Sequence, residues 1–298
     1  MIWIILALLG VVFTALTTIL AKIGIKNVNS NFATFIRTGV VILCSLVLCF
    51  ITGDIAKTNQ LELNNWIFLV LSGIMTGCSW LCYYKALKIG NVNKVTPIDK
   101  SSFILTSILF MIFFFSDTTN NGDPLTIIML TVSMILMFIG TILMIDKKED
   151  SKQTSRSWLL FAVLSAVFAS LVSLFVKFGL KGIPSNLGTL YRTIIVFIFA
   201  GTIVLFRKDY SDVKSISGIS WLFLILSGIA TGGAWLCEYG ALNYEGANPI
   251  VVNTIGKLSI LLTMFLSFII LKEKFNKKSL LGLGILTLGI ILIIVFSL

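Results

Sequence analysis

The sequence is short of charged side chains and has no histidine. Of its 298 residues, 13 are acidic and 23 are lysine or arginine, so charged residues make up only 12% of the chain, whereas 57% are hydrophobic. A soluble globular protein cannot keep so much apolar surface away from water. The shortage of charge therefore excludes an ordinary soluble protein and indicates an integral membrane protein that lies in a lipid bilayer.

The lack of histidine also removes the most common catalytic base and zinc ligand. Cys78 and Cys82 lie one helical turn apart, but no histidine is present to complete a zinc site. A nucleophile and its base would have to be a serine and a lysine, with Ser102 or Ser259 as the only route. We expect no metal, no cofactor, no disulfide and no enzymatic activity.

Ten hydrophobic segments approach or exceed the roughly 20 residues that a helix needs to cross a bilayer. Charges and turn residues separate them. Each is predicted to be a membrane-spanning helix, and the approximate limits are 3–23, 32–52, 66–87, 95–115, 125–145, 157–178, 187–206, 221–243, 249–271 and 279–297.

The chain repeats itself across its middle. The run AKIGIKNVNSNFATFIRTGVV, which begins at Ala21, returns at Val176 as VKFGLKGIPSNLGTLYRTIIV. Likewise, LSGIMTGCSWLCYYKAL at Leu71 returns at Leu226 as LSGIATGGAWLCEYGAL. Each half carries five predicted spans, and an odd number places the second half upside down relative to the first.

The predicted fold is therefore an all-α integral membrane protein with ten transmembrane helices, arranged as two inverted five-helix repeats. The first repeat covers residues 1–145 and the second covers 157–298. A polar run, DKKEDSKQTSRS, begins at Asp146 and supplies the linker of residues 146–156 between them.

Lysine and arginine are distributed by membrane side. Among the loop residues, only Lys57 and Lys181 lie on the side where the chain begins, and the others lie on the opposite side. Because cytoplasmic loops are rich in lysine and arginine, both termini are predicted outside a cytoplasmic membrane. The topology accounts for the net charge of +10, so no nucleic-acid partner is expected. The abundance of lysine, isoleucine and asparagine is typical of an AT-rich bacterial genome.

Several charged residues lie within the predicted spans, where such residues usually serve a function. Arg37 and Asp99 lie on the cytoplasmic side of the midplane, and their counterparts Arg192 and Glu238 lie on the outer side. We expect Arg37 to pair with Asp99 and Arg192 to pair with Glu238, so that the pairs form two gates. The two acids are also the candidates for proton coupling, since no histidine is available.

Lys100 and Lys257 occupy equivalent positions in the repeat, in TPIDKSSFILT and NTIGKLSILLT. They are candidates for direct contact with a substrate, and packing against backbone carbonyls is the alternative. The acid of the first segment, Asp99, is replaced by Gly256 in the second, and Tyr83 is replaced by Glu238.

Each repeat also has an aromatic pair spaced by four residues, which places both rings on one helix face. These pairs are Trp80 with Tyr84, and Trp235 with Tyr239. They are candidates for lining a substrate site. For the two tyrosines, the alternative is an interfacial belt near the helix ends.

The run SGIMTGCSWLCYYKALKIGNVNKVTPIDKSSFILT, together with AKIGIKNVNSNFATFIRT, resembles the EamA-type members of the drug/metabolite transporter superfamily. The resemblance implies a metabolite transporter with a central cavity lined by the third, fourth, eighth and ninth spans. It maps Trp80, Tyr84, Asp99 and Lys100 to that cavity and implies export. The LGEKL-like element of the family is LKEKF at Leu271, but the first half has FFSDTTNNGDP at the corresponding place.

The sequence thus predicts a secondary transporter that moves a small polar metabolite by alternating access. Intramembrane cations outnumber acids, which favours an amino acid or another carboxylate-bearing solute. The alternative substrates are organic cations or drugs held by the aromatic rings. A channel or a lipid scramblase is a further alternative. A monomer would suffice for any of these functions.

Overall fold

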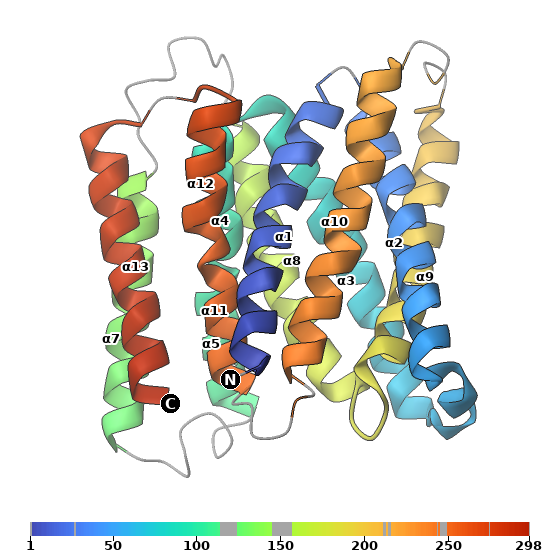
Figure 1. The fold of residues 1–298 in the computed structure, drawn as a ribbon, viewed down its shortest axis with the longest axis horizontal. Helices are drawn as coiled ribbons and strands as arrows, with labels where there is room; N and C mark the ends of the chain where they lie inside the picture. Colours follow the sequence, from blue (N-terminus) through green and yellow to red (C-terminus); the bar gives the residue numbers. More distant parts are fainter. Residues whose placement is uncertain are drawn as a thin grey trace.

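The computed structural model describes residues 2–26, 28–113, 124–144, 157–210, 213, 216–242, 244, 249–273 and 275–297, and over these ranges the chain is helical with no strand. The helices stand side by side as a bundle, with the two chain ends marked at the same end of it (Figure 1). The linker predicted at residues 146–156 lies outside the described residues.

The first half of the chain forms α1 (Ile2–Gly24), α2 (Ser30–Thr52), a short 3₁₀ helix η1 (Asp54–Gln60), α3 (Leu63–Ile89), α4 (Val92–Lys100), α5 (Ser102–Phe113) and α7 (Pro124–Met144). The second half forms α8 (Ser157–Gly179), α9 (Ser185–Arg207), α10 (Gly218–Leu242), α11 (Pro249–Lys257), α12 (Ser259–Ile270) and α13 (Lys277–Ser297).

Seven of the described helices are long and apolar enough to cross a membrane, namely α1, α2, α3, α7, α8, α9 and α10. The chain is therefore an all-helical, multi-pass membrane protein. The spans predicted at 95–115 and 249–271 each consist of two shorter helices in line. The last predicted span falls within α13, which has 21 residues. The count of ten spans stays a prediction.

Contacts between helices occur in matched pairs across the two halves. α1 packs along α10, and its equivalent α8 packs along α3; α2 also lies against α10, as α9 lies against α3. Two further pairs join equivalent helices, α2 with α9 and α7 with α13. Each half thus finds its main helix partners in the other half.

Glycines allow the closest of these helix contacts. A Cβ added at Gly73 of α3 would lie 2.7 Å from Cβ of Ile195 on α9, and one at Gly228 of α10 would lie 2.7 Å from Cβ of Val40 on α2. One turn further along, Gly77 and Gly232 face Phe199 and Cys44 in the same way. The small-xxx-small spacing lets the two backbones approach in both halves.

Polar side chains join α2 and α9 at both of their ends. Asp54, which follows α2, accepts a hydrogen bond from Nδ2 of Asn186 at the start of α9, at 3.0 Å. Asp209, which follows α9, accepts one from Nδ2 of Asn31 at the start of α2, at 2.7 Å. We call these two contacts the Asp–Asn clasps.

Candidate functional site

Each half contains a broken helix, in which a one-residue turn directly follows a lysine. α4 ends at Lys100 and α5 begins at Ser102, whereas α11 ends at Lys257 and α12 begins at Ser259. In Figure 1, α4 lies above α5 but α11 lies below α12, so the two broken helices run in opposite directions. α4 contacts α12, and each lysine lies at the carbonyl end of its half-helix, which carries a partial negative charge.

Lys257 lies in a mixed electrostatic environment. It interacts electrostatically with Lys100, Glu238 and Asp99, and its Nζ lies 5.7 Å from the ring centroid of Phe103. The structure therefore brings together both candidate lysines and both candidate acids, which come from three different helices of the two repeats.

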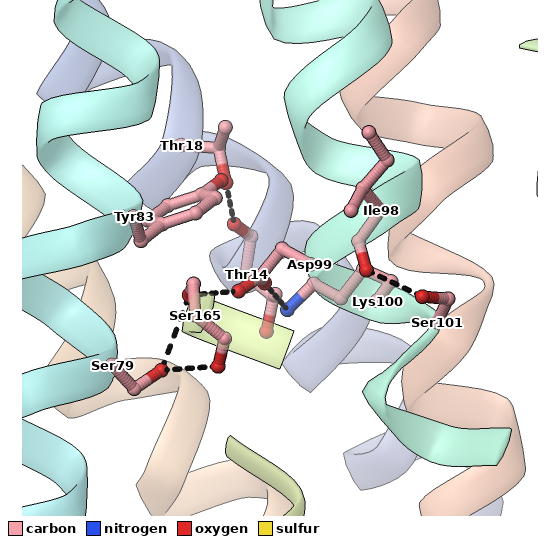
Figure 2. A network of polar contacts seen from close by, with 9 residues as sticks. All are labelled: Thr14, Thr18, Ser79, Tyr83, Ile98, Asp99, Lys100, Ser101 and Ser165. Carbon is pink, nitrogen blue, oxygen red and sulfur yellow. Dashed lines mark hydrogen bonds and ion pairs between the residues drawn. The ribbon is translucent and has the colours of Figure 1, made fainter. Parts of the chain in front are cut away.

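A hydrogen-bonded network holds the Asp99 carboxylate, as Figure 2 shows. Oδ1 accepts a hydrogen bond of 2.6 Å from Ser165 on α8, and Oδ2 lies 4.0 Å from Nζ of Lys100. Ser79 on α3 donates to the backbone oxygen of Ser165 at 3.1 Å, and the two serine hydroxyl oxygens lie 3.2 Å apart. Asp99 thereby links α4, α8 and α3.

Tyr83 lies beside this network. It is buried, its hydroxyl lies 3.2 Å from that of Thr18 on α1, and it interacts electrostatically with both Asp99 and Arg37. Sequence reasoning did not select Tyr83, Ser79 or Ser165 as site residues. The available signal was the change from Tyr83 to Glu238 between the repeats, which marked that helix face as polar.

The two candidate tryptophans meet each other. The rings of Trp80 and Trp235 are stacked, with centroids 5.8 Å apart and planes inclined by 29°. An arginine lies on each: Arg37 is 5.9 Å from the Trp80 centroid, and Arg192 is 5.6 Å from the Trp235 centroid. Equivalent residues of the two repeats thus form one central layer.

Of the two tyrosines in the aromatic pairs, only Tyr84 has a described side chain. Tyr84 is buried, 3% exposed, and its ring centroid lies 4.2 Å from the Arg37 guanidinium carbon. It is therefore a core residue and not part of an interfacial belt. The side chain of Tyr239 lies outside the described residues.

The expected ion pair between Arg37 and Asp99 is wrong. Arg37 is fully buried, and its Nε donates to the Ser227 hydroxyl at 2.5 Å while Nη2 donates to the Thr231 hydroxyl at 3.1 Å. Both hydroxyls belong to α10, the helix on which α2 packs. The Arg37 guanidinium group thus contacts the Ser227 and Thr231 hydroxyls and the Tyr84 ring instead of the Asp99 carboxylate.

Arg192 forms no ion pair with Glu238 in the described part of this structure, so the expected pairing stays a prediction for the state in which that gate is shut. Arg192 is 6% exposed, and its guanidinium lies on the Trp235 ring. Among the described side chains, no ion pair joins it to Glu238, and its buried Nε has no hydrogen-bond partner. The two equivalent arginines therefore differ in their hydrogen bonding.

Among the described residues, no group of three histidine, cysteine or acidic side chains could hold a metal ion. All five cysteines there are free thiols. The candidate site thus consists of lysines, arginines, two acids and aromatic rings.

The chain matches the sequence profile of the EamA-like transporter family over residues 1–145 and again over residues 156–295. It belongs to the EamA-like transporter family. This EamA-like chain is 39% identical over 138 residues to a Sinorhizobium sp. protein described as an uncharacterized transporter in the cobO 3′ region. That alignment covers 46% of this chain and 96% of the relative, so the relative is about half as long.

A solved crystal structure is similar over almost the whole EamA-like chain. The alignment covers 98% of this chain and 97% of the other, with a TM-score of 0.68 and 11% sequence identity. At that identity the likeness concerns the fold alone. The family and the half-length relative together identify this chain as a membrane transporter of the EamA-like family.

Proposed function

We propose that this EamA-like protein moves a small anionic or zwitterionic metabolite across the cytoplasmic membrane by alternating access. An amino acid or another carboxylate-bearing solute fits best. The observation that carries this proposal is the contact between the two broken helices, whose lysines, Lys100 and Lys257, interact electrostatically. Discontinuous helices at mid-membrane are a common way for transporters to build a substrate site.

The balance of charge supports an anionic group on the substrate. The buried or half-buried cations of the central region are Arg37, Lys100, Arg192 and Lys257, against the two acids Asp99 and Glu238. Buried charges are stable when they are paired, so a net positive site favours an anion. Since Lys257 has electrostatic contact with a second lysine, an added carboxylate would relieve repulsion there.

The packing supports a ten-helix topology of two inverted repeats. The broken helices run in opposite directions, equivalent helices form reciprocal contacts, and both chain ends lie at one end of the bundle. With the excess of lysine and arginine on the other side, we place both termini outside the cell. Export is the direction that the family resemblance implies.

Organic cations are the weaker substrate candidate. A cation would use the faces of Trp80 and Trp235, but these rings stack on each other and on Arg37 and Arg192. A second cation at the same rings would be repelled by the two guanidinium groups.

Counterflow in proteoliposomes tests the proposal. Liposomes loaded with one unlabelled amino acid or organic acid should accumulate the same labelled solute when the wild-type protein is present. Lys257→Met and Lys100→Met should each reduce that accumulation about tenfold or more, as expected when a charge-assisted contact is lost. Lys26→Met, an exposed loop change, serves as the control. Unchanged counterflow by both central variants would refute the lysine site, and passive leakage without counterflow would refute a carrier.

A further inference from the structure

One polar network of this protein has no copy in the other repeat. Asp99, Ser165 and Ser79 are hydrogen-bonded to one another on α4, α8 and α3. The three positions equivalent by the repeat are Gly256, Gly10 and Ala234. Gly10 lies against α10 as Ser165 lies against α3, since a Cβ on Gly10 would be 3.6 Å from the Ala234 oxygen. None of the three polar side chains is therefore present at the equivalent positions of the other repeat.

The network satisfies Asp99 in its ionised form. A carboxylate only accepts hydrogen bonds, so the 2.6 Å contact has Ser165 as the donor. The Ser79 hydroxyl then donates to the backbone oxygen of Ser165. Lys100, at 4.0 Å, supplies the opposite charge.

The same atoms also satisfy a protonated Asp99. The acid would donate to the Ser165 hydroxyl oxygen, Ser165 would rotate its proton toward the Ser79 oxygen at 3.2 Å, and Ser79 would keep its bond to the Ser165 backbone. No buried hydroxyl loses its partner in either form. If Asp99 stayed ionised, Ser165 would always donate to the carboxylate, and the Ser79 oxygen would not be needed as an acceptor for the Ser165 hydroxyl.

We infer that Asp99, with Ser165 and Ser79, is the proton-binding site of the transport cycle. An anion that binds Lys100 draws the ammonium group away from Asp99, and a proton from the adjoining aqueous side takes its place on the carboxylate. One O–H bond forms on Asp99 while one O–H bond of a hydronium ion breaks and releases water, and no other covalent bond changes. Binding of a monoanion at Lys100 is thus accompanied by binding of one proton at Asp99. The anion step rests on the proposed function.

The other titratable groups near Asp99 are few. Tyr83 faces it from α3 and Lys257 from α11, in addition to Lys100 on its own helix. The helices α5, α7 and α12 carry no titratable side chain, and the lysines of α1 and α8 lie in the last turns of those helices. Lys100 is therefore the cation whose removal should matter most.

Glu238 lacks the features that favour a proton site. It is half-buried, and among the described residues no hydrogen bond or ion pair of its carboxylate is present. We therefore assign the proton to Asp99 alone of the two central acids.

Dicyclohexylcarbodiimide provides a test that needs no substrate, because it reacts with protonated carboxylic acids in apolar surroundings. The purified protein is treated over a series of buffers from mildly acidic to mildly alkaline, and the adduct is located by peptide mass spectrometry. The wild type should be labelled at Asp99, increasingly as the buffer becomes more acidic. Asp99→Asn should lose this adduct, and Glu238→Gln should keep it.

Two further variants test the mechanism. Lys100→Met imitates the withdrawal of the ammonium group and should raise the labelled fraction several-fold in alkaline buffer. Ser79→Ala removes the spare acceptor and should lower the labelled fraction, whereas Ser173→Ala on α8, whose hydroxyl bonds only within its own helix, should not. Near-ultraviolet circular dichroism checks that each variant is folded.

The outcomes separate this inference from the proposed function. No adduct at Asp99 in any buffer, or the same profile in Lys100→Met as in the wild type, would overturn the proton site even if counterflow of an anion is observed. Labelling that follows the expected pattern would support the proton site even if counterflow fails for every anion, in which case only the proposed substrate class is refuted.

Discussion

Asp54 accepts a hydrogen bond from Asn186, and the equivalent residues of the repeat, Asp209 and Asn31, form the same bond at the opposite end of the α2–α9 pair. The contact is reciprocal, since each acid comes from the half that does not supply its amide. Both Asp–Asn clasps are closed in one structure, so α2 and α9 are tied together at both faces. The two clasps therefore fix the ends of α2 and α9 to each other.

The Asp54 clasp should stabilise the protein in a pH-dependent way. Burial opposes ionisation of Asp54, but hydrogen bonds from Thr52, Asn186 and Lys57 outweigh it, and the pKa of the carboxyl is lowered from its ordinary value of 3.8. A lowered pKa gives stability that is complete above the ordinary value and is lost as the pH falls through the lowered one. Asp54→Asn should therefore melt at a lower temperature than the wild type at neutral pH.

Acidification supplies the control for this prediction. The difference in melting temperature between wild type and Asp54→Asn should shrink below about pH 4, where the wild-type carboxyl also becomes neutral. A difference that stays constant down to that pH would show that the charge of Asp54 does not contribute. Thermal unfolding followed by intrinsic fluorescence measures both values.

Alanine at the crossing glycines should destabilise both halves to a similar extent. Gly73→Ala and Gly228→Ala each place a methyl group 2.7 Å from a β-branched side chain, which requires helix movement that costs about 1–3 kcal/mol. Gly284→Ala is the matched control, because no neighbouring atom lies within 4 Å of its added Cβ. Equal melting temperatures for all three variants would contradict the close packing.

Arg192→Lys should destabilise the protein less than Arg37→Lys does. Arg37→Lys loses at least one of two hydrogen bonds to buried hydroxyls, each worth about 1.5–3 kcal/mol for a charged donor. Nε of Arg192 has no hydrogen-bond partner in the described structure, so Arg192→Lys gives up less there. The melting temperatures of the two variants test this prediction. A larger decrease for Arg192→Lys than for Arg37→Lys would contradict it.

The proposed topology predicts which loop positions face the outside. In intact cells, a membrane-impermeant maleimide should label Lys181→Cys but not Lys26→Cys until the cells are broken. Both positions are exposed, and the unmodified protein reports any labelling of the five native cysteines. Labelling of Lys26→Cys alone in intact cells would place both termini in the cytoplasm.

The helical fold and the repeat could be predicted because both depend on local patterns. Long apolar runs require helices in a bilayer, and matching runs reveal duplicated units. The turns that follow Lys100 and Lys257 were not predicted. Both turn residues, Ser101 and Leu258, keep a right-handed helical backbone, so the predicted fourth and ninth spans each contain a one-residue interruption.

The repeat marked Lys100 and Lys257 as equivalent residues, and in the structure the two lysines interact electrostatically, while their role in a substrate site stays a prediction. The partners of the other candidate residues were harder to predict. Arg37 was assigned to Asp99 by charge, but α2 packs on α10, so the serine and threonine hydroxyls of that helix reach the guanidinium first. Stacking of Trp80 on Trp235 likewise depends on how the two halves approach, which no spacing within one half records.

The reciprocal packing of α1 with α10 and of α8 with α3 has an evolutionary consequence. A complex of two identical five-helix chains would carry every side chain twice, so a carboxylate gained on one side would appear on the other. Joining the halves in one polypeptide lets Asp99 remain where its counterpart has become glycine. The two faces of the membrane then meet chemically different halves of the protein, which gives an otherwise symmetric scaffold a built-in polarity.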